Sequence, residues 1–303
     1  MQPKISASMD ETLISQISEG NEKALARAIS IVENEQPGYD ALLQSLHPNP
    51  VQIIGITGPP GAGKSTLVDG LIGELVKRNK KVTVLCVDPS SPFNLGALLG
   101  DRIRMSTWYT HPNVFIRSLA TRGSVGGLTP KIIEITDLIK SADFDSIIVE
   151  TVGVGQSEIE IAGLADVTVV VVVPESGDEV QTMKAGLMEI GDIFVINKAD
   201  RPGAEVLEKK LRTLTSIDAT HAPTIIKTIA TESKGIDKLI QAIDDHKNVE
   251  RATEKRVALL TEKAWQLMSA KRMKDVNKAR LRDLIQANHE KEGFNLFSFI
   301  NRM

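Results

Sequence analysis

The residues with the plainest chemical meaning form a glycine-rich loop that ends in a lysine and a serine. The loop reads Gly58-Pro59-Pro60-Gly61-Ala62-Gly63-Lys64-Ser65 and directly follows an apolar run. Glycines let a backbone wrap around phosphate with its amides pointing inward, and the start of the following helix adds a favourable dipole. The lysine offers a cation to terminal phosphates, and the serine hydroxyl can bind Mg²⁺. The loop therefore predicts a nucleotide phosphate site made of Gly58, Pro59, Pro60, Gly61, Ala62, Gly63, Lys64, Ser65 and Thr66.

Two acidic residues stand at the ends of apolar runs that can neighbour the strand before this loop. They are Asp88 and Glu150. Mg²⁺ bound to a triphosphate prefers few carboxylates, with water completing its octahedron. We expect Ser65, Asp88 and Glu150 to hold Mg²⁺ directly or through water, with Asp101 as a further candidate ligand. Capping of a helix or turn is the alternative role for these acids, and it competes most strongly at Asp101.

A second motif, Asn197-Lys198-Ala199-Asp200, follows a later apolar run and matches the NKxD pattern that GTPases use for guanine. A carboxylate can accept hydrogen bonds from guanine N1 and N2, and adenine has no equivalent pair of donors. Asp200 is therefore the predicted specificity residue, Lys198 can lie along the base and Asn197 can brace the loop. A later loop can supply a backbone amide to guanine O6, although the usual Ser-Ala pair is replaced in the sequence Ile229, Ala230 and Thr231.

The segment after Glu150 is rich in glycine and is placed to sense the terminal phosphate. Gly153 lets the chain approach phosphate closely, and loss of that phosphate can release such a loop. Gln156 can orient the attacking water, but a structural or solvent-facing role fits it equally well. The candidate catalytic residues are Lys64, Asp101, Glu150 and Gln156.

The elements that must position these residues alternate between apolar strands and helical stretches. Strands are expected at residues 53–57, 82–87, 114–118, 147–149, 167–173, 193–196 and 224–229. Continuously apolar strands that alternate with helices indicate a mostly parallel sheet covered on both faces. Polar residues then gather at the carboxyl ends of the strands, where the ligand crevice of an open α/β sheet lies.

The predicted fold is therefore α/β, a P-loop NTPase domain with helical extensions at both ends. We expect an N-terminal helical extension over residues 1–50, with one helix near residues 10–34. The P-loop domain then covers residues 51–246, and a helical arm covers residues 247–303. The arm contains a long charged stretch, from about Asn248 to Met273, with apolar positions that include Val257, Leu260, Trp265 and Leu267.

Composition restricts the compartment and the partners. The chain has 303 residues, a formal net charge of -3 and one cysteine, Cys86. The absence of a basic excess disfavours nucleic acid, and the single cysteine cannot form an intrachain disulfide. No apolar segment approaches membrane-spanning length. We expect a cytoplasmic protein with neither a nucleic-acid nor a membrane partner, and with Cys86 as a buried core residue.

Together these motifs resemble the SIMIBI-class GTPases of the MeaB/ArgK family, the methylmalonyl-CoA mutase-associated GTPases or cobalamin chaperones. The resemblance extends from the Ala24 region to about Gly235. It includes the phosphate loop and residues 88–92, 96–102, 117–118, 121–123, 150–158 and 197–200. It implies GTP or GDP and Mg²⁺ as cofactors. The departures are Asn94-Leu95 and the altered loop at Ala230.

The resemblance also implies how such a protein works. Residues 88–102 would form switch I, residues 150–158 switch II, and residues 177–186 a third switch toward the partner; the residues alone indicate a solvated loop there. The implied partner is an adenosylcobalamin-dependent acyl-CoA mutase, whose cofactor loading or protection GTP hydrolysis would gate. A homodimer formed through the C-terminal helices is implied as well.

Three other functions remain open at this level. One is a kinase or ATPase linked to amino-acid transport, and another is a metallochaperone GTPase for a different metalloenzyme. The third is a nucleotide-bound scaffold with negligible hydrolysis. The absence of a Cys/His cluster in the sequence disfavours the metallochaperone.

Overall fold

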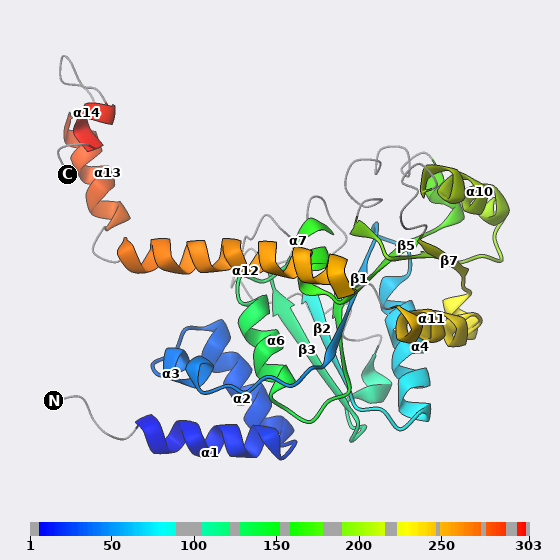
Figure 1. The fold of residues 1–303 in the computed structure, drawn as a ribbon, viewed down its shortest axis with the longest axis horizontal. Helices are drawn as coiled ribbons and strands as arrows, with labels where there is room; N and C mark the ends of the chain where they lie inside the picture. Colours follow the sequence, from blue (N-terminus) through cyan, green and yellow to red (C-terminus); the bar gives the residue numbers. More distant parts are fainter. Residues whose placement is uncertain are drawn as a thin grey trace. The chain divides into compact units, whose positions relative to one another are not determined.

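Seven parallel strands form one sheet in the described part of the chain (Figure 1). The structure, a computed structural model, describes residues 6–88, 105–121, 128–151, 158–177, 190–215, 223–246, 249–273, 277–288 and 296–300. The strand order across the sheet is β3-β2-β4-β1-β5-β6-β7. The strands are β1 (Gln52–Thr57), β2 (Val82–Asp88), β3 (Val114–Ala120), β4 (Ser146–Glu150), β5 (Val167–Val172), β6 (Ile193–Ile196) and β7 (Thr224–Lys227). The expected α/β fold with a mostly parallel sheet is confirmed.

The strand ends carry the differences from expectation that matter most. β2 and β4 each extend one residue further than the apolar pattern indicates, so Asp88 and Glu150 are themselves the last strand residues. β7 ends at Lys227, before the predicted end, because Ile229 forms an antiparallel bridge with Lys234. That bridge turns the chain into a short 3-10 helix, η5 (Ala230–Glu232).

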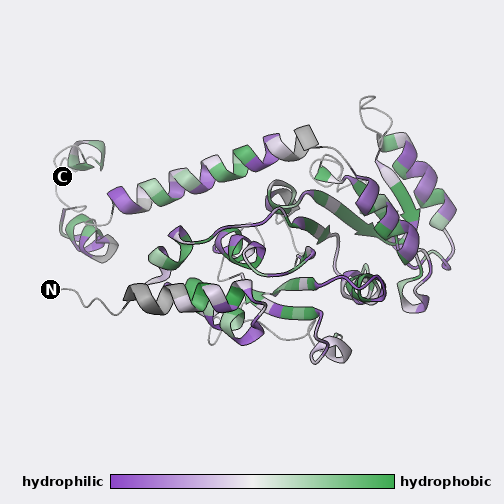
Figure 2. Ribbon diagram, turned by 60° about the horizontal axis from the view of Figure 1, so that its bottom comes forward, coloured by the Kyte–Doolittle hydropathy of each residue, from purple (hydrophilic) through white to green (hydrophobic). Residues whose placement is uncertain are grey.

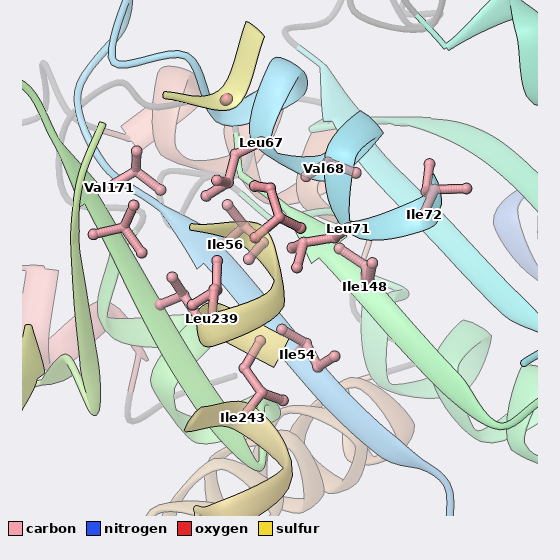
Figure 3. Packing of buried hydrophobic residues seen from close by; sticks show 14 of the residues in the cluster. Ile54, Ile56, Leu67, Val68, Leu71, Ile72, Ile148, Val171, Leu239 and Ile243 are labelled. Atoms are coloured by element: carbon pink, nitrogen blue, oxygen red, sulfur yellow. The ribbon is translucent and has the colours of Figure 1, made fainter. Parts of the chain in front are cut away.

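Helices cover both faces of the sheet. Alternate residues of a strand point to opposite faces, so Ile54 and Ile56 of β1 pack with α4 (Lys64–Lys77) and α11 (Ile236–Asp245) in one core (Figure 3). Gly55 faces the other side, where α7 (Glu158–Leu164) packs against β1. A second core joins β5 and β6 to α7 and α10 (Ala204–Thr215). Figure 2 shows the apolar strands inside and hydrophilic residues along the outer side of α10.

The expected single helix over residues 10–34 is wrong, because the chain forms two helices there. α1 (Ser6–Ser18) ends before Gly20, which adopts a left-handed φ of 82°. Asn21 then caps α2 (Glu22–Glu33) by accepting a hydrogen bond of 3.0 Å from Ala24 N–H. The glycine terminates one helix and the asparagine begins the next, so the apolar stripe continues through a break in the backbone.

The N-terminal helices are fastened to the edge of the sheet. α2 packs against α6 (Ile132–Lys140), and α3 (Tyr39–Gln44) packs on α1. Arg117 of β3 donates to Glu33 Oε2 at 2.6 Å and to Ser30 Oγ at 3.0 Å, both on α2. Arg117, part of a motif that carries the family resemblance, therefore serves to hold α2.

By its contacts the chain divides into two compact units, residues 1–256 and 257–303. α12 (Val249–Arg272) begins in the first unit, where Arg256 Nη1 donates to Leu164 O at 2.9 Å. The second unit contains the rest of α12, α13 (Lys278–Asn288) and α14 (Leu296–Ile300). Within the described ranges, no helix is both long enough and apolar enough to cross a membrane.

Candidate nucleotide site

The glycine-rich loop joins the end of β1 to the start of α4, as its sequence predicts. Two of its glycines are required by geometry. At Gly58, with φ 136°, a Cβ atom would lie 2.1 Å from Val171 O, and at Gly63, with φ 88°, it would lie 2.4 Å from Asn197 Nδ2. A side chain at either position would collide with fixed neighbours in a backbone conformation that favours glycine. The loop is thus shaped by close approach to β5 and to the loop after β6.

Lys64 is the first residue of α4 and folds back over the loop. Its Nζ donates to Gly58 O at 2.9 Å and to Pro59 O at 3.2 Å, and its side chain is buried. A buried ammonium group held by two carbonyl oxygens presents a fixed positive charge to the concave side of the loop. This arrangement suits neutralisation of terminal phosphates.

The next residue meets one of the predicted acids. Ser65 Oγ donates to Glu150 Oε1 at 2.8 Å, and Glu150 is 2% exposed. Asp88, also 2% exposed, ends the neighbouring strand β2. Because Cys86 pairs with Glu150 in the register and Asp88 lies two residues further, both acids lie on one face of the sheet. The hydroxyl oxygen of Ser65 and the carboxylate oxygens of Glu150 and Asp88 are the kind of ligands that a small hard cation such as Mg²⁺ prefers.

Asn197 links the phosphate loop to the predicted base loops. Its Nδ2 donates to Ala62 O at 2.9 Å. Its Oδ1 accepts from Thr228 Oγ1 at 3.1 Å and from Ala230 N–H at 3.2 Å. The side chain is 2% exposed, so all three bonds are made in a dry environment. Asn197 therefore braces three segments that lie far apart in the sequence.

The rest of the NKAD motif forms a tight turn over the phosphate loop. Lys198 adopts a left-handed φ of 54°, and its Nζ donates to Gly61 O at 2.8 Å. Arg201 N–H closes the turn on Lys198 O at 3.0 Å, which leaves the Asp200 side chain exposed to solvent. An exposed carboxylate on a braced turn is available to the edge of a base.

An ion pair flanks this turn. Arg201 donates to Glu175 of η3 (Pro174–Gly177), the short helix that follows β5. The hydrogen bond from Arg201 is the main reason that the pKa of Glu175 lies below its usual range. Both side chains are about half exposed, so the pair orients the turn more than it stabilises the fold.

Several predicted or implied site residues fall outside the described ranges, so the structure does not place them. They are Asp101, Gly153, Gln156 and most of the three segments named as switches. Thr231 is exposed in η5, and Ala230 N–H, a candidate donor to guanine O6, is directed to Asn197. Cys86 is buried in the core, as expected.

Sequence reasoning missed three threonines that support the site. Thr228 holds Asn197, and the Thr151 hydroxyl donates to Thr57 Oγ1 at 3.0 Å. Thr57 and Thr151 lie at or just beyond the carboxyl ends of the buried strands β1 and β4, and Thr228 directly follows β7. A threonine in that position of an otherwise apolar strand is the signal that would have drawn attention to them.

A phosphate loop between β1 and α4, buried acids at adjacent strand ends and an NKxD turn beside the loop define a P-loop GTPase. The profile described as methylmalonyl Co-A mutase-associated GTPase MeaB matches residues 25–285, and the chain belongs to this family. Its membership confirms the resemblance seen in the sequence and the assignment of guanine-nucleotide hydrolysis.

Named relatives agree with this membership. A putative GTPase of Pyrococcus horikoshii is 46% identical over 245 residues, covering 78% of this chain and 77% of the relative. The GTPase ArgK of Escherichia coli is 36% identical over 254 residues, which cover 79% of this chain and 76% of the relative. A Caenorhabditis elegans protein described as a mitochondrial methylmalonic aciduria type A homolog is 37% identical over 207 residues, covering 63% of this chain and 52% of its own length.

A solved structure has a similar fold. The crystal structure of a LAO/AO transport system kinase aligns with a TM-score of 0.66 at 26% identity, and the alignment covers 96% of both chains. The similarity therefore includes the helical extensions as well as the sheet.

Proposed function

We propose that this GTPase is a Mg²⁺-dependent conformational switch that serves an adenosylcobalamin-dependent acyl-CoA mutase of the methylmalonyl-CoA mutase type. The observation that carries the proposal is the 2.8 Å bond between Ser65 and Glu150. It connects the phosphate loop to the residue from which the glycine-rich segment 151–157 departs. The family description and the C. elegans relative support the choice of client.

In the proposed reaction a water oxygen attacks the γ-phosphorus of GTP, and the bond to the β–γ bridging oxygen breaks to give GDP and phosphate. Ser65, Glu150 and Asp88 would hold Mg²⁺, which supplies charge neutralisation at the phosphates when bound. Lys64 offers its fixed ammonium group to the same charge. Positioning and electrostatics account for most catalysis of this kind. Gln156 or Asp101 would assist the attacking water.

The base site in this proposal consists of the NKAD turn and the η5 loop. Asp200 accepts from guanine N1 and N2, Lys198 lies along the ring and Asn197 holds both loops. Ile229 N–H donates to Lys234 O and Ala230 N–H donates to Asn197 Oδ1, so the backbone amide of Thr231 would be the one that contacts guanine O6. GTP and GDP are then discriminated from adenine nucleotides by the exposed carboxylate of Asp200.

Switching would pass from the phosphates to α7. The helix begins directly after residues 151–157 and presses closely on β1, since a Cβ atom at Gly55 would lie 2.6 Å from Ile161 Cγ1. Glu150 is joined to α7 by one short segment, and α7 is tightly packed on β1. A shift of Glu150 would therefore be passed on to α7 and the strand beneath it. Residues 88–102 and 150–158 would act as switches I and II, and residues 177–186 as a third switch toward the mutase. GTP hydrolysis would then gate cofactor loading or protection of the mutase.

The second unit would mediate homodimer formation. Large apolar side chains are exposed in it at Val257, Leu260, Trp265, Leu267 and Met268, with Trp265 65% exposed. A second copy of the chain would cover these apolar side chains. On this proposal residues 1–50, 51–246 and 247–303 are the helical extension, the GTPase domain and the dimer arm. The protein would work in the cytoplasm.

The decisive experiment measures GTP hydrolysis by the purified full chain with Mg²⁺, with and without a methylmalonyl-CoA mutase from the same organism. We expect slow intrinsic turnover and a clear acceleration by the mutase. Lys64→Ala should abolish both rates, because it removes the cation that faces the phosphates. Turnover that is indifferent to the mutase, together with complex affinity that is indifferent to nucleotide, would remove the mutase from the proposal. Transfer of labelled phosphate to a protein would favour the kinase alternative.

A further inference from the structure

Two buried hydroxyls connect the start of the phosphate loop to the residue after Glu150. Thr57 is the last residue of β1, and Thr151 follows the last residue of β4. The Thr151 hydroxyl donates to Thr57 Oγ1 at 3.0 Å, and Thr151 N–H donates to Ile56 O at 3.0 Å. Thr57 is 0% exposed and Thr151 2% exposed, so the hydroxyl contact is made out of water.

The contact completes a closed path of backbone and hydrogen bonds that includes the phosphate loop. From Thr57 the chain runs through the loop to Ser65, whose hydroxyl donates to Glu150 at 2.8 Å. Glu150 is joined by a peptide bond to Thr151, and Thr151 returns to Thr57 through the 3.0 Å hydroxyl bond. The loop approaches β5 closely at Gly58, where an added Cβ atom would lie 2.1 Å from Val171 O.

We infer that Thr57 and Thr151 are positioning residues that hold the Glu150 carboxylate in register with the phosphate loop. They thereby set how strongly Mg²⁺ supports nucleotide binding. The inference rests on the proposed Mg²⁺ role of Glu150. Replacing one threonine by valine keeps its shape but leaves the other hydroxyl buried beside a methyl group, which disfavours the closed arrangement. The carboxylate is then free to move away from Ser65.

The test uses the equilibrium binding of a fluorescent GDP analogue to the full chain at increasing Mg²⁺ concentrations, and in EDTA. GDP is not hydrolysed, so the readout is independent of turnover. For Thr151→Val we expect the Mg²⁺ concentration for half-maximal tightening to rise by about tenfold, the size expected from stranding one buried hydroxyl. The affinity in EDTA should stay within about twofold of the wild type, because the hydroxyl bond that is lost joins the two threonines to each other.

Three further variants separate positioning from folding. Thr151→Ser keeps the hydroxyl and should restore most of the Mg²⁺ response. The double variant Thr57→Val with Thr151→Val removes both hydroxyls together and should be less impaired than either single valine. Thr136→Val is the matched control, since the hydroxyl of this buried threonine donates to Ile133 O at 2.9 Å within α6, away from the site. It should leave the Mg²⁺ response unchanged.

The outcomes are distinguishable. If wild-type GDP binding does not respond to Mg²⁺, the proposed metal role fails and the inference fails with it. If the wild type responds and Thr151→Val responds equally, or loses affinity equally in EDTA and in Mg²⁺, only the positioning role is overturned. Should Thr151→Val not fold, Thr57→Val breaks the same hydroxyl bond and takes its place, and a Mg²⁺ response of Thr57→Val equal to that of the wild type refutes the inference.

Discussion

Replacement of Asn197 by alanine is the sharpest test of how the base loops are held. The change removes the hydrogen bonds to Ala62, Thr228 and Ala230, at 2.9, 3.1 and 3.2 Å. All three partners lie in the buried interior of the site, so water cannot replace the amide without opening the loops. The variant should therefore fold with a looser guanine site.

The magnitude follows from the number of bonds. A typical hydrogen bond contributes about 1 kcal/mol net, and a stranded buried group costs roughly 1–3 kcal/mol. Three bonds together predict a loss of about 3 kcal/mol, which corresponds to a fall in GDP affinity of up to about 100-fold if binding must reorder the loops. Thr228→Val removes one of the three bonds and should weaken GDP binding by about fivefold.

The measurements are GDP affinity by fluorescence titration and unfolding free energy by urea titration. Asn49→Ala is the control, because this asparagine is exposed and remote from the loops. The loss of GDP affinity should be largest for Asn197→Ala, intermediate for Thr228→Val and near zero for Asn49→Ala. GDP affinity within twofold of wild type for Asn197→Ala, or a larger loss for Thr228→Val, would refute the bracing role.

Three other variants examine separate parts of the protein. Asp200→Asn replaces an acceptor oxygen with a donor, so GDP affinity should fall at least about tenfold while xanthosine diphosphate binds relatively better in the same titration. Gly58→Ala places a methyl group 2.1 Å from Val171 O at a φ of 136°; nucleotide binding should be lost and the melting temperature lowered, and normal binding would contradict this geometry. Arg256→Gln removes the 2.9 Å bond to Leu164 O, and faster amide exchange at the start of α12 should report the loosened attachment.

Local sequence patterns are sufficient to predict the main motifs of the site. The phosphate loop, the NKAD motif and the strand-terminal acids Asp88 and Glu150 were all recognisable from neighbours in the sequence. This is possible because a strand, a glycine-rich turn and a helix start are adjacent along the chain and have their own residue preferences. The same local signals existed at Gly20 and Asn21, but the continuous apolar stripe led to one predicted helix where there are two.

Tertiary structure alone decided which of these pieces touch. Ser65 meets Glu150, Thr57 meets Thr151, and Asn197 meets Ala62 across 135 residues of sequence. These contacts depend on β4 and β5 flanking β1. Strands that are apolar on both faces carry no pattern that specifies their neighbours, so their order is set by the packing of helices and connections over the whole domain. The chemical groups of the site can be predicted from local sequence patterns, whereas the contacts between these groups follow from the order of the strands.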